Sequence, residues 1–158
     1  MTKIEVLSVV LVIGVCGSLA ASAVLTARLH TRDATRLSHV REIQDSLESY
    51  FTDHAGYPVS ATPLALGQGS TQCLSADGFA CSIAPSSSYL RVVPTPPTTG
   101  LKKQSSCSGV DNAYCYAGNA ISYHLQFELE AANRPLGLAK GANCITESSL
   151  SAGACPAL

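Results

Sequence analysis

The sequence predicts an α+β protein in which one long N-terminal helix packs on a small antiparallel β-sheet, next to a disulfide-stapled C-terminal loop. Residues 6–27 carry no formal charge, residues 28–56 show an amphipathic repeat, and residues 57–158 are polar and contain six of the seven cysteines. The buried stripe of a helix and the apolar face of a sheet can each cover the other. We therefore expect an apolar helical half, an amphipathic half of the same helix, and an extracellular globular head.

Residues 6–27 form an uncharged segment that a helix would extend over roughly 33 Å, enough to cross a bilayer. Three interpretations remain open: a cleavable secretory signal ending near residues 21–23, a plain membrane anchor, or a helix that packs in a filament. Glu5 separates them, because an ionisable side chain at the start of a membrane helix is a functional candidate. The simpler alternative is an interfacial pair between Lys3 and Glu5.

The amphipathic repeat continues the helix from residue 28 to residue 56. No proline interrupts residues 1–57, so the sequence predicts one helix of about 50 residues, ending where Gly56 and Pro58 follow. The predicted buried stripe is Leu29, Arg36/Leu37, Val40, Ile43, Leu47, Tyr50/Phe51 and His54. Basic and acidic side chains alternate along the helix and favour a salt-bridged interface with partner subunits: Arg28, Arg32, Asp33, Arg36, Arg41, Glu42 and Asp45.

The clearest strand signal in the head is the alternation of apolar and polar residues from 120 to 130. It places Ile121, Tyr123, Leu125, Phe127 and Leu129 on the apolar face. It places Ser122, His124, Gln126, Glu128 and Glu130 on the polar face. Residues 112–116 precede it across Gly118 and Asn119, which suggests a hairpin. We expect a loop over residues 59–88, a short strand near residues 89–93, and an irregular C-terminal loop from Asn133 onward.

The cysteines also divide between helix and head, since Cys16 lies in the uncharged segment and the other six lie after residue 57. An even number in a small domain indicates disulfides formed in an oxidising compartment. Six cysteines allow 15 connectivities. We favour neighbour pairing, because each pair closes a short loop of turn-forming residues: Cys73–Cys81, Cys107–Cys115 and Cys144–Cys155. A zinc site is disfavoured, because no CxxC occurs and no histidine stands at ligand spacing from a cysteine.

A search for catalytic chemistry finds no constellation of residues that supports an enzyme. His30, His39, His54 and His124 are dispersed, and the GxSxG and HExxH motifs are absent. The acidic residues lack calcium-loop spacing. A net charge of −1 gives no general attraction to nucleic acid. We therefore expect no catalytic residues, no metal, no cofactor and no specific nucleic acid.

The N-terminal sequence resembles that of type IV pilins and the related pseudopilins. The resemblance rests on the string TKIEVLSVVLVIGVCGSLAASAVLTA with Glu5 at its fifth position, the amphipathic continuation, and the closing Gly56-Tyr57-Pro58. It covers about residues 1–60 closely. Met1 stands where the family usually has phenylalanine, and Ser22 where it has proline. Without that proline, Gly14 and Gly17 are the expected points of helix flexibility.

The resemblance implies a major pilin, a structural subunit of an extracellular filament whose N-terminal helices bundle. Glu5 would pair with the Met1 amine of a neighbouring subunit. The implied partners are copies of the chain itself, the cytoplasmic membrane before assembly, the pilus assembly machinery and a prepilin peptidase. Alternatives are a secretion pseudopilin, whose calcium loop is replaced here by cysteines, and a non-polymerising anchored or secreted binding domain.

Overall fold

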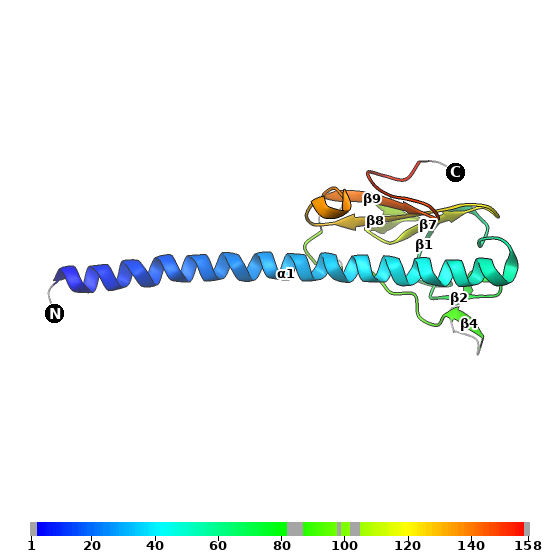
Figure 1. Ribbon diagram of the computed structural model, residues 1–158. Helices are drawn as coiled ribbons and strands as arrows, with labels where there is room; N and C mark the ends of the chain where they lie inside the picture. The colour runs from blue at the N-terminus through cyan, green and yellow to red at the C-terminus, as the bar shows by residue number, and fades with distance from the viewer. Residues whose placement is uncertain (1–2, 82–86, 98, 102–104, 157–158) are drawn as a thin grey trace.

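The protein is a long helix with a head packed along its second half (Figure 1). The computed structural model describes residues 3–81, 87–97, 99–101 and 105–156, with only the backbone of residues 3, 4 and 9. Helix α1 runs without interruption over Lys3–His54, 52 residues. The predicted single helix is therefore confirmed. Met1, the expected partner of Glu5, lies outside the described residues.

The largest sheet has five antiparallel strands in the order β1-β7-β8-β9-β10. The strands span Ser60–Ala65 (β1), Cys115–Gly118 (β7), Tyr123–Leu129 (β8), Gly141–Thr146 (β9) and Leu150–Ala152 (β10). β7 and β8 form the predicted hairpin, with Cys115 opposite Gln126 and Gly118 opposite Tyr123. Helix α1 contacts the central strand β8, so the sheet covers one side of the second half of the helix.

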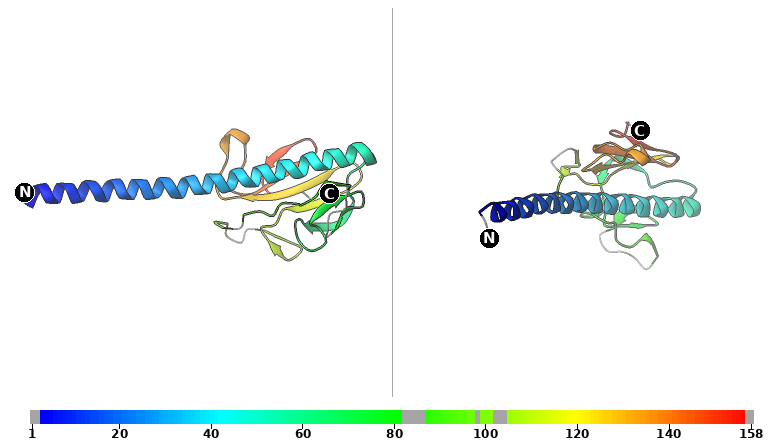
Figure 2. Two further views of the ribbon diagram at one scale, coloured as in Figure 1. Left: turned by 90° about the horizontal axis from the view of Figure 1, so that it is seen from below. Right: turned by 60° about the vertical axis from the view of Figure 1, so that its left-hand side comes forward.

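Two smaller sheets complete the head. β2 (Cys73–Ser75), β3 (Gly78–Cys81) and β4 (Ser88–Leu90) form one, and β5 (Ser106–Cys107) and β6 (Val110–Asp111) form the other. β4 contacts α1, and β2–β4 lie across the helix from the five-stranded sheet (Figures 1 and 2). A 3₁₀ turn at Arg134–Leu136 leads into β9.

Two expectations about the head were wrong. Residues 59–88 are not a loop, since β1, β2 and β3 lie there, and the expected strand near residues 89–93 begins earlier, in β4. The C-terminal part is not irregular, because it contains β9 and β10. The physical reason is the same in both cases. Short strands rich in Ser, Gly and Ala carry little alternation of their own. Neighbouring strands supply their hydrogen bonds, either in a hairpin, as for β2 and β3, or from far along the chain, as for β1 and β7.

The helix stripe and the inner face of the sheet form one apolar core. Val40, Ile43, Leu47 and Tyr50 of α1 share one buried cluster with Tyr123, Leu125, Phe127 and Leu129 of β8, as expected from the two periodicities. Phe51 and His54, expected on the buried stripe, are exposed instead. Ile121 was also expected to face the core but is 82% exposed, because it lies in the turn before β8.

The predicted alternation of apolar and polar faces is also wrong at the C-terminal end of β8. Glu128 and Glu130 were expected on a polar, outward face, but their exposed fractions are 2% and 7%. Glu130 lies just beyond β8 and reaches α1, and Glu128 is buried within the strand. Alternation predicts a polar face only where one face of the strand meets water, whereas Glu128 is buried and Glu130, beyond the strand end, pairs with the arginines of α1.

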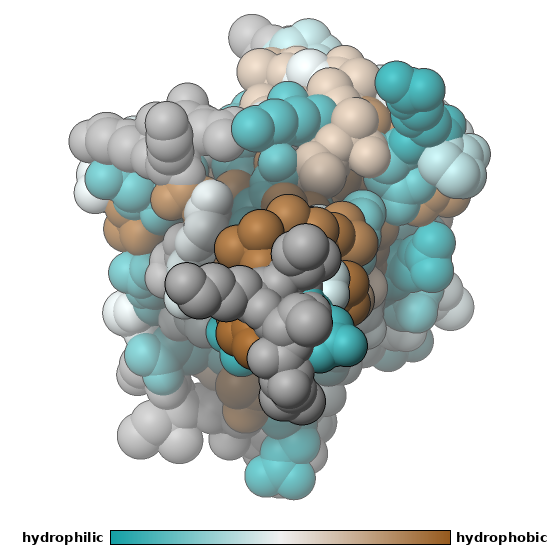
Figure 3. All heavy atoms as spheres, turned by 90° about the vertical axis from the view of Figure 1, so that its left-hand side faces the viewer, coloured by the Kyte–Doolittle hydropathy of each residue, from teal (hydrophilic) through white to brown (hydrophobic). Residues whose placement is uncertain are grey.

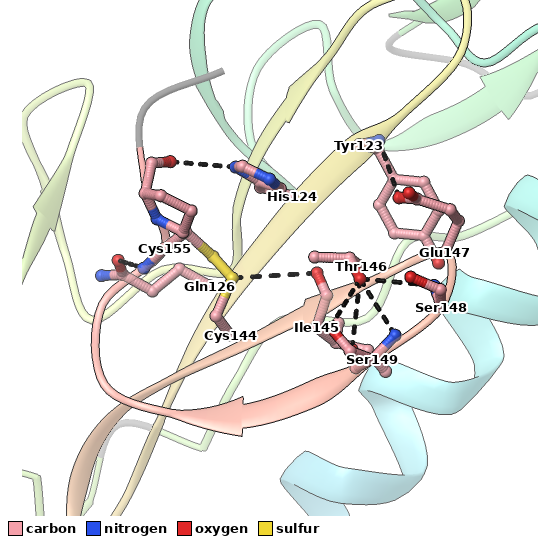
Figure 4. Close-up of a disulfide and its surroundings, with 11 residues drawn as sticks. Tyr123, His124, Gln126, Cys144, Ile145, Thr146, Glu147, Ser148, Ser149 and Cys155 are labelled. Atoms are coloured by element: carbon pink, nitrogen blue, oxygen red, sulfur yellow. Dashed lines mark hydrogen bonds between the residues drawn. A yellow bond between two sulfur atoms is a disulfide. The ribbon is translucent and has the colours of Figure 1, made fainter.

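The six head cysteines form the neighbour pairs favoured from the sequence: Cys73–Cys81, Cys107–Cys115 and Cys144–Cys155. The last pair ties the C-terminal strand region to β9 (Figure 4). Beside it, the Cys155 backbone N–H donates to the Gln126 side chain at 3.3 Å, and the Pro156 carbonyl lies 2.9 Å from His124 Nδ1. Cys16 is a free, exposed cysteine.

Candidate assembly helix and its junction with the head

The first half of α1 is a bare apolar helix. Every described side chain from residue 5 to residue 28 is exposed. Figure 3 looks along the helix from its N-terminal end and shows hydrophobic residues on it in front of a largely hydrophilic head. α1 is long and apolar enough to cross a membrane by length and composition. Ten large apolar side chains are at least half exposed: Val6, Leu7, Val10, Leu11, Val12, Ile13, Val15, Leu19, Val24 and Leu25.

This apolar surface is too large for a protein to present to water without a partner. Burying one such side chain fully stabilises by about 1.5–3 kcal/mol. Ten of them, even if only partly covered, sum to at least about 10 kcal/mol, which is comparable with the whole stability of a typical domain. The segment of residues 6–27, called here the apolar segment, therefore requires lipid or another apolar protein surface around it.

Glu5 lies in the first turn of α1, where the helix dipole favours an acidic side chain. Its side chain is exposed, and its carbonyl accepts a hydrogen bond from the Ser8 hydroxyl at 2.8 Å. Gly14 and Gly17 lie inside the continuous helix, and a Cβ at either would meet no atom within 4 Å. The helix is unbroken at both glycines, and their role in flexibility stays a prediction.

A buried ionic cluster joins α1 to the head where the apolar segment leaves it. We call Arg32, Asp33, Arg36 and Glu130 the collar. Arg36 Nη1 lies 2.7 Å from both Asp33 Oδ1 and Glu130 Oε1, and its side chain is completely buried. Arg32 binds Glu130 through two bonds, Nε–Oε1 at 2.6 Å and Nη2–Oε2 at 2.5 Å. Asp33 also accepts hydrogen bonds from the backbone N–H groups of Glu130 and Ala131.

The loop after β4 closes over the collar. The Arg36 guanidinium donates to the carbonyls of Pro97 and Thr99. Gly100 turns above the Arg32–Glu130 pair with φ of +87°, where a Cβ would overlap the Glu130 carboxylate and lie 2.7 Å from Arg32 Nη2. The collar therefore holds together three segments that are distant in the sequence: the helix, the end of β8 and this loop.

The charges of the collar support one another. Hydrogen bonding to Arg32 lowers the pKa of the Glu130 carboxyl, and the same bond raises the pKa of the Arg32 guanidinium. A buried charge is tolerated when it is paired and hydrogen-bonded, and Arg36 meets both conditions.

The collar corrects the expectation for the basic residues of the helix. Arg32 and Arg36 were expected to contact partner subunits, but both are paired inside the chain, whereas Arg28 and Arg41 are exposed. The role of Glu130 was missed. One signal was available, because Arg36 falls on the predicted buried stripe, and a charge there demands a buried acidic partner.

At its other end, α1 is fixed to the sheet by Gly56-Tyr57-Pro58. The Tyr57 backbone N–H donates to the Ala120 carbonyl at 3.1 Å, and the Tyr57 hydroxyl donates to Glu48 at 3.0 Å. The Pro58 carbonyl accepts a hydrogen bond from the buried Tyr116 hydroxyl at 2.7 Å. The three residues therefore connect the helix end to the β7–β8 hairpin and not only stop the helix.

The histidines and cysteines do not gather into a site. His39 lies beside the Tyr114 hydroxyl, His54 stacks on Tyr50, and His124 faces the C-terminal tail. Among the residues that the structure describes, no group of three or more His, Cys, Asp or Glu side chains could hold a metal ion.

Comparisons with protein families, with curated protein sequences and with solved structures found no match. The architecture alone defines the class of protein. A long N-terminal helix, apolar and exposed in its first half, packs by its second half on an antiparallel sheet. This is a pilin-like architecture. The apolar helix and the three disulfides are features of a membrane-anchored or secreted protein.

Proposed function

We propose that the chain is the major structural subunit of an extracellular, type IV pilus-like filament. The observation that carries the proposal is the apolar segment, which projects beyond the head and exposes its side chains on all sides. Before assembly the segment lies in the cytoplasmic membrane. On assembly, the segments of many copies bundle in the filament interior, and the disulfide-bonded heads coat the outside.

Glu5 sets the axial register of this bundle. Apolar helices can slide past one another, because dispersion and burial are not directional. An ionisable side chain at the start of an apolar helix is a functional candidate by default. The N-terminal amine of a neighbouring subunit is the partner proposed here, and pairing the two fixes the relative height of two copies.

The proposal assigns no catalytic role and no metal or cofactor to the chain. Its partners are copies of itself, the membrane, the pilus assembly machinery and a prepilin peptidase. A secretion pseudopilin would share the helix and its Glu5. A non-polymerising anchored domain would share only the apolar segment.

The test compares the unaltered chain with Glu5→Ala and Glu5→Gln, measuring membrane insertion and the yield of filaments sheared from the cell surface. Both variants should insert normally and assemble poorly, because each lacks the negative charge. Normal filaments from either variant would contradict the role of Glu5. An unaltered chain that remains monomeric would contradict the filament itself.

A further inference from the structure

A groove runs along the head half of α1, beside the C-terminal loops. It consists of two adjoining cavities of about 410 and 280 Å³, and Leu37 lines both. The helix side chains that line them recur at spacings of three and four residues, which places them on one face. They are His30, Asp33, Ala34, Leu37, Val40, Arg41 and Gln44. The stretch from His30 to Gln44 corresponds to roughly 21 Å of helix.

The side chains that line the centre of this groove are uncharged, and most of them are small. Ala34 and Leu37 line the helix side, and Ala131 and Ala132 line the opposite wall near the 3₁₀ turn. Ile145 lines the second cavity and is buried beneath it. Asp33 is engaged in the collar. The remaining charged side chains, Arg41, Arg134 and Glu147, are exposed, so they stand at the rim and in contact with water.

We propose that the apolar segment of a second copy of this chain lies in this groove. The segment has no formal charge over 22 residues and is about 33 Å long as a helix, longer than the groove. An uncharged floor matches such a segment, whereas charged floor residues would have to lose their hydration without compensation. Alanines on both walls let two helices approach closely.

The segment that fills the groove must come from another molecule. α1 is one continuous helix, and its N-terminal half points away from the head, so a chain cannot fold its own apolar segment back into its own groove. The inference rests on the proposed function and deepens it. Groove and segment are different surfaces of the same chain, so their contact is heterologous. Heterologous contacts that do not close into a ring generate open helical filaments.

A photo-crosslinking experiment tests the contact in filaments of the full chain, whatever the register of the segment. A benzophenone side chain is placed at Ala34 in the groove, with exposed Ala80 of β3 as the matched control position. After irradiation, the product from position 34 should have twice the subunit mass, and its crosslink should map to residues 6–27 of the second copy. Position 80 should give no such product. Intact filaments whose position-34 crosslinks map only to heads would overturn the groove and leave the filament proposal standing.

A charge in the groove provides a second measurement. Ala132→Glu places a carboxylate on the wall without touching the collar or the core, and Ala80→Glu places the same charge elsewhere on the head. Ala132→Glu should insert in the membrane with all three disulfides formed, and its filament yield should fall at least about tenfold. Ala80→Glu should assemble normally. Normal yield from Ala132→Glu would overturn the groove. An unaltered chain that forms no filaments would overturn both proposals.

Discussion

Arg32 and Glu130 form a two-pronged ion pair, 98 residues apart in the sequence, at the point where α1 leaves the head. Glu130 also holds Arg36, whose side chain has no exposed surface. The apolar segment ends at residue 27, only a few residues before Arg32. The direction in which the segment projects therefore depends on the collar.

Replacing Glu130 by alanine should destabilise the fold by about 3–5 kcal/mol, because Arg36 would keep its burial and lose one of its two anionic partners. The measurement is denaturant unfolding of the full chain in detergent. Asp77→Ala is the control, since Asp77 is an exposed acidic residue between β2 and β3, and should change the stability by less than about 0.5 kcal/mol. An equally small effect at Glu130 would contradict the structural role of the collar.

Gly100→Ala should destabilise more than Gly137→Ala. Both glycines have positive φ, +87° and +68°, so a methyl group costs about 1–2 kcal/mol of backbone strain at each. At Gly137 the added Cβ meets no atom within 4 Å, but at Gly100 it overlaps the Glu130 carboxylate and displaces it from Arg32. The extra loss at Gly100 should be at least about 1 kcal/mol. Equal melting temperatures for the two variants would show that the loop containing Gly100 shifts to accept the methyl group without disturbing the Arg32–Glu130 pair.

Glu128→Leu should stabilise the protein at neutral pH by on the order of 1–3 kcal/mol. Glu128 is 2% exposed, and among the described residues no hydrogen-bond partner reaches its carboxylate oxygens in normal geometry. Burial raises the pKa of this carboxyl, and the nearby Ser105 hydroxyl opposes the shift. The comparison is a pair of melting curves, with the exposed Glu42→Leu as the control.

The stability gained by Glu128→Leu should depend on pH, and the direction of this dependence follows from the raised pKa of Glu128. A carboxyl with a raised folded pKa keeps its proton in the folded state at pH values where the unfolded chain has lost it. The native protein should therefore lose stability as pH rises from the ordinary glutamate pKa through the raised one. The stabilisation by Glu128→Leu should accordingly be smaller in acid and larger at neutral pH. A stabilisation independent of pH would mean that the pKa of the Glu128 carboxyl is the same in the folded and unfolded chains, which would contradict the effect of burial.

Much of the fold follows from local patterns in the sequence. The 22 uncharged residues, the three-to-four-residue stripe of α1 and the alternation through Tyr123, Leu125 and Phe127 each identify an element without knowledge of its partner. The neighbour pairing of the cysteines was also accessible, because each disulfide closes a short loop. These features depend only on the spacing of residues along the chain, which can be read directly from the sequence.

The charged residues near the junction acquire their roles only in the folded chain. Local patterns place Arg36 on the buried stripe and Glu130 on the polar face of a strand, and their 94-residue separation carries no signal that the two meet. β1 was likewise not predicted, because its partner β7 begins only at Cys115, and β2, β9 and β10 were not predicted because they carry little apolar–polar alternation. The groove beside Leu37 arises only when the C-terminal loops dock along α1. Local patterns in the sequence therefore identify which segments are apolar and helical. The long-range pairing of buried charges, and of β1 with β7, required the folded chain, because those energies depend on partners that are close only in space.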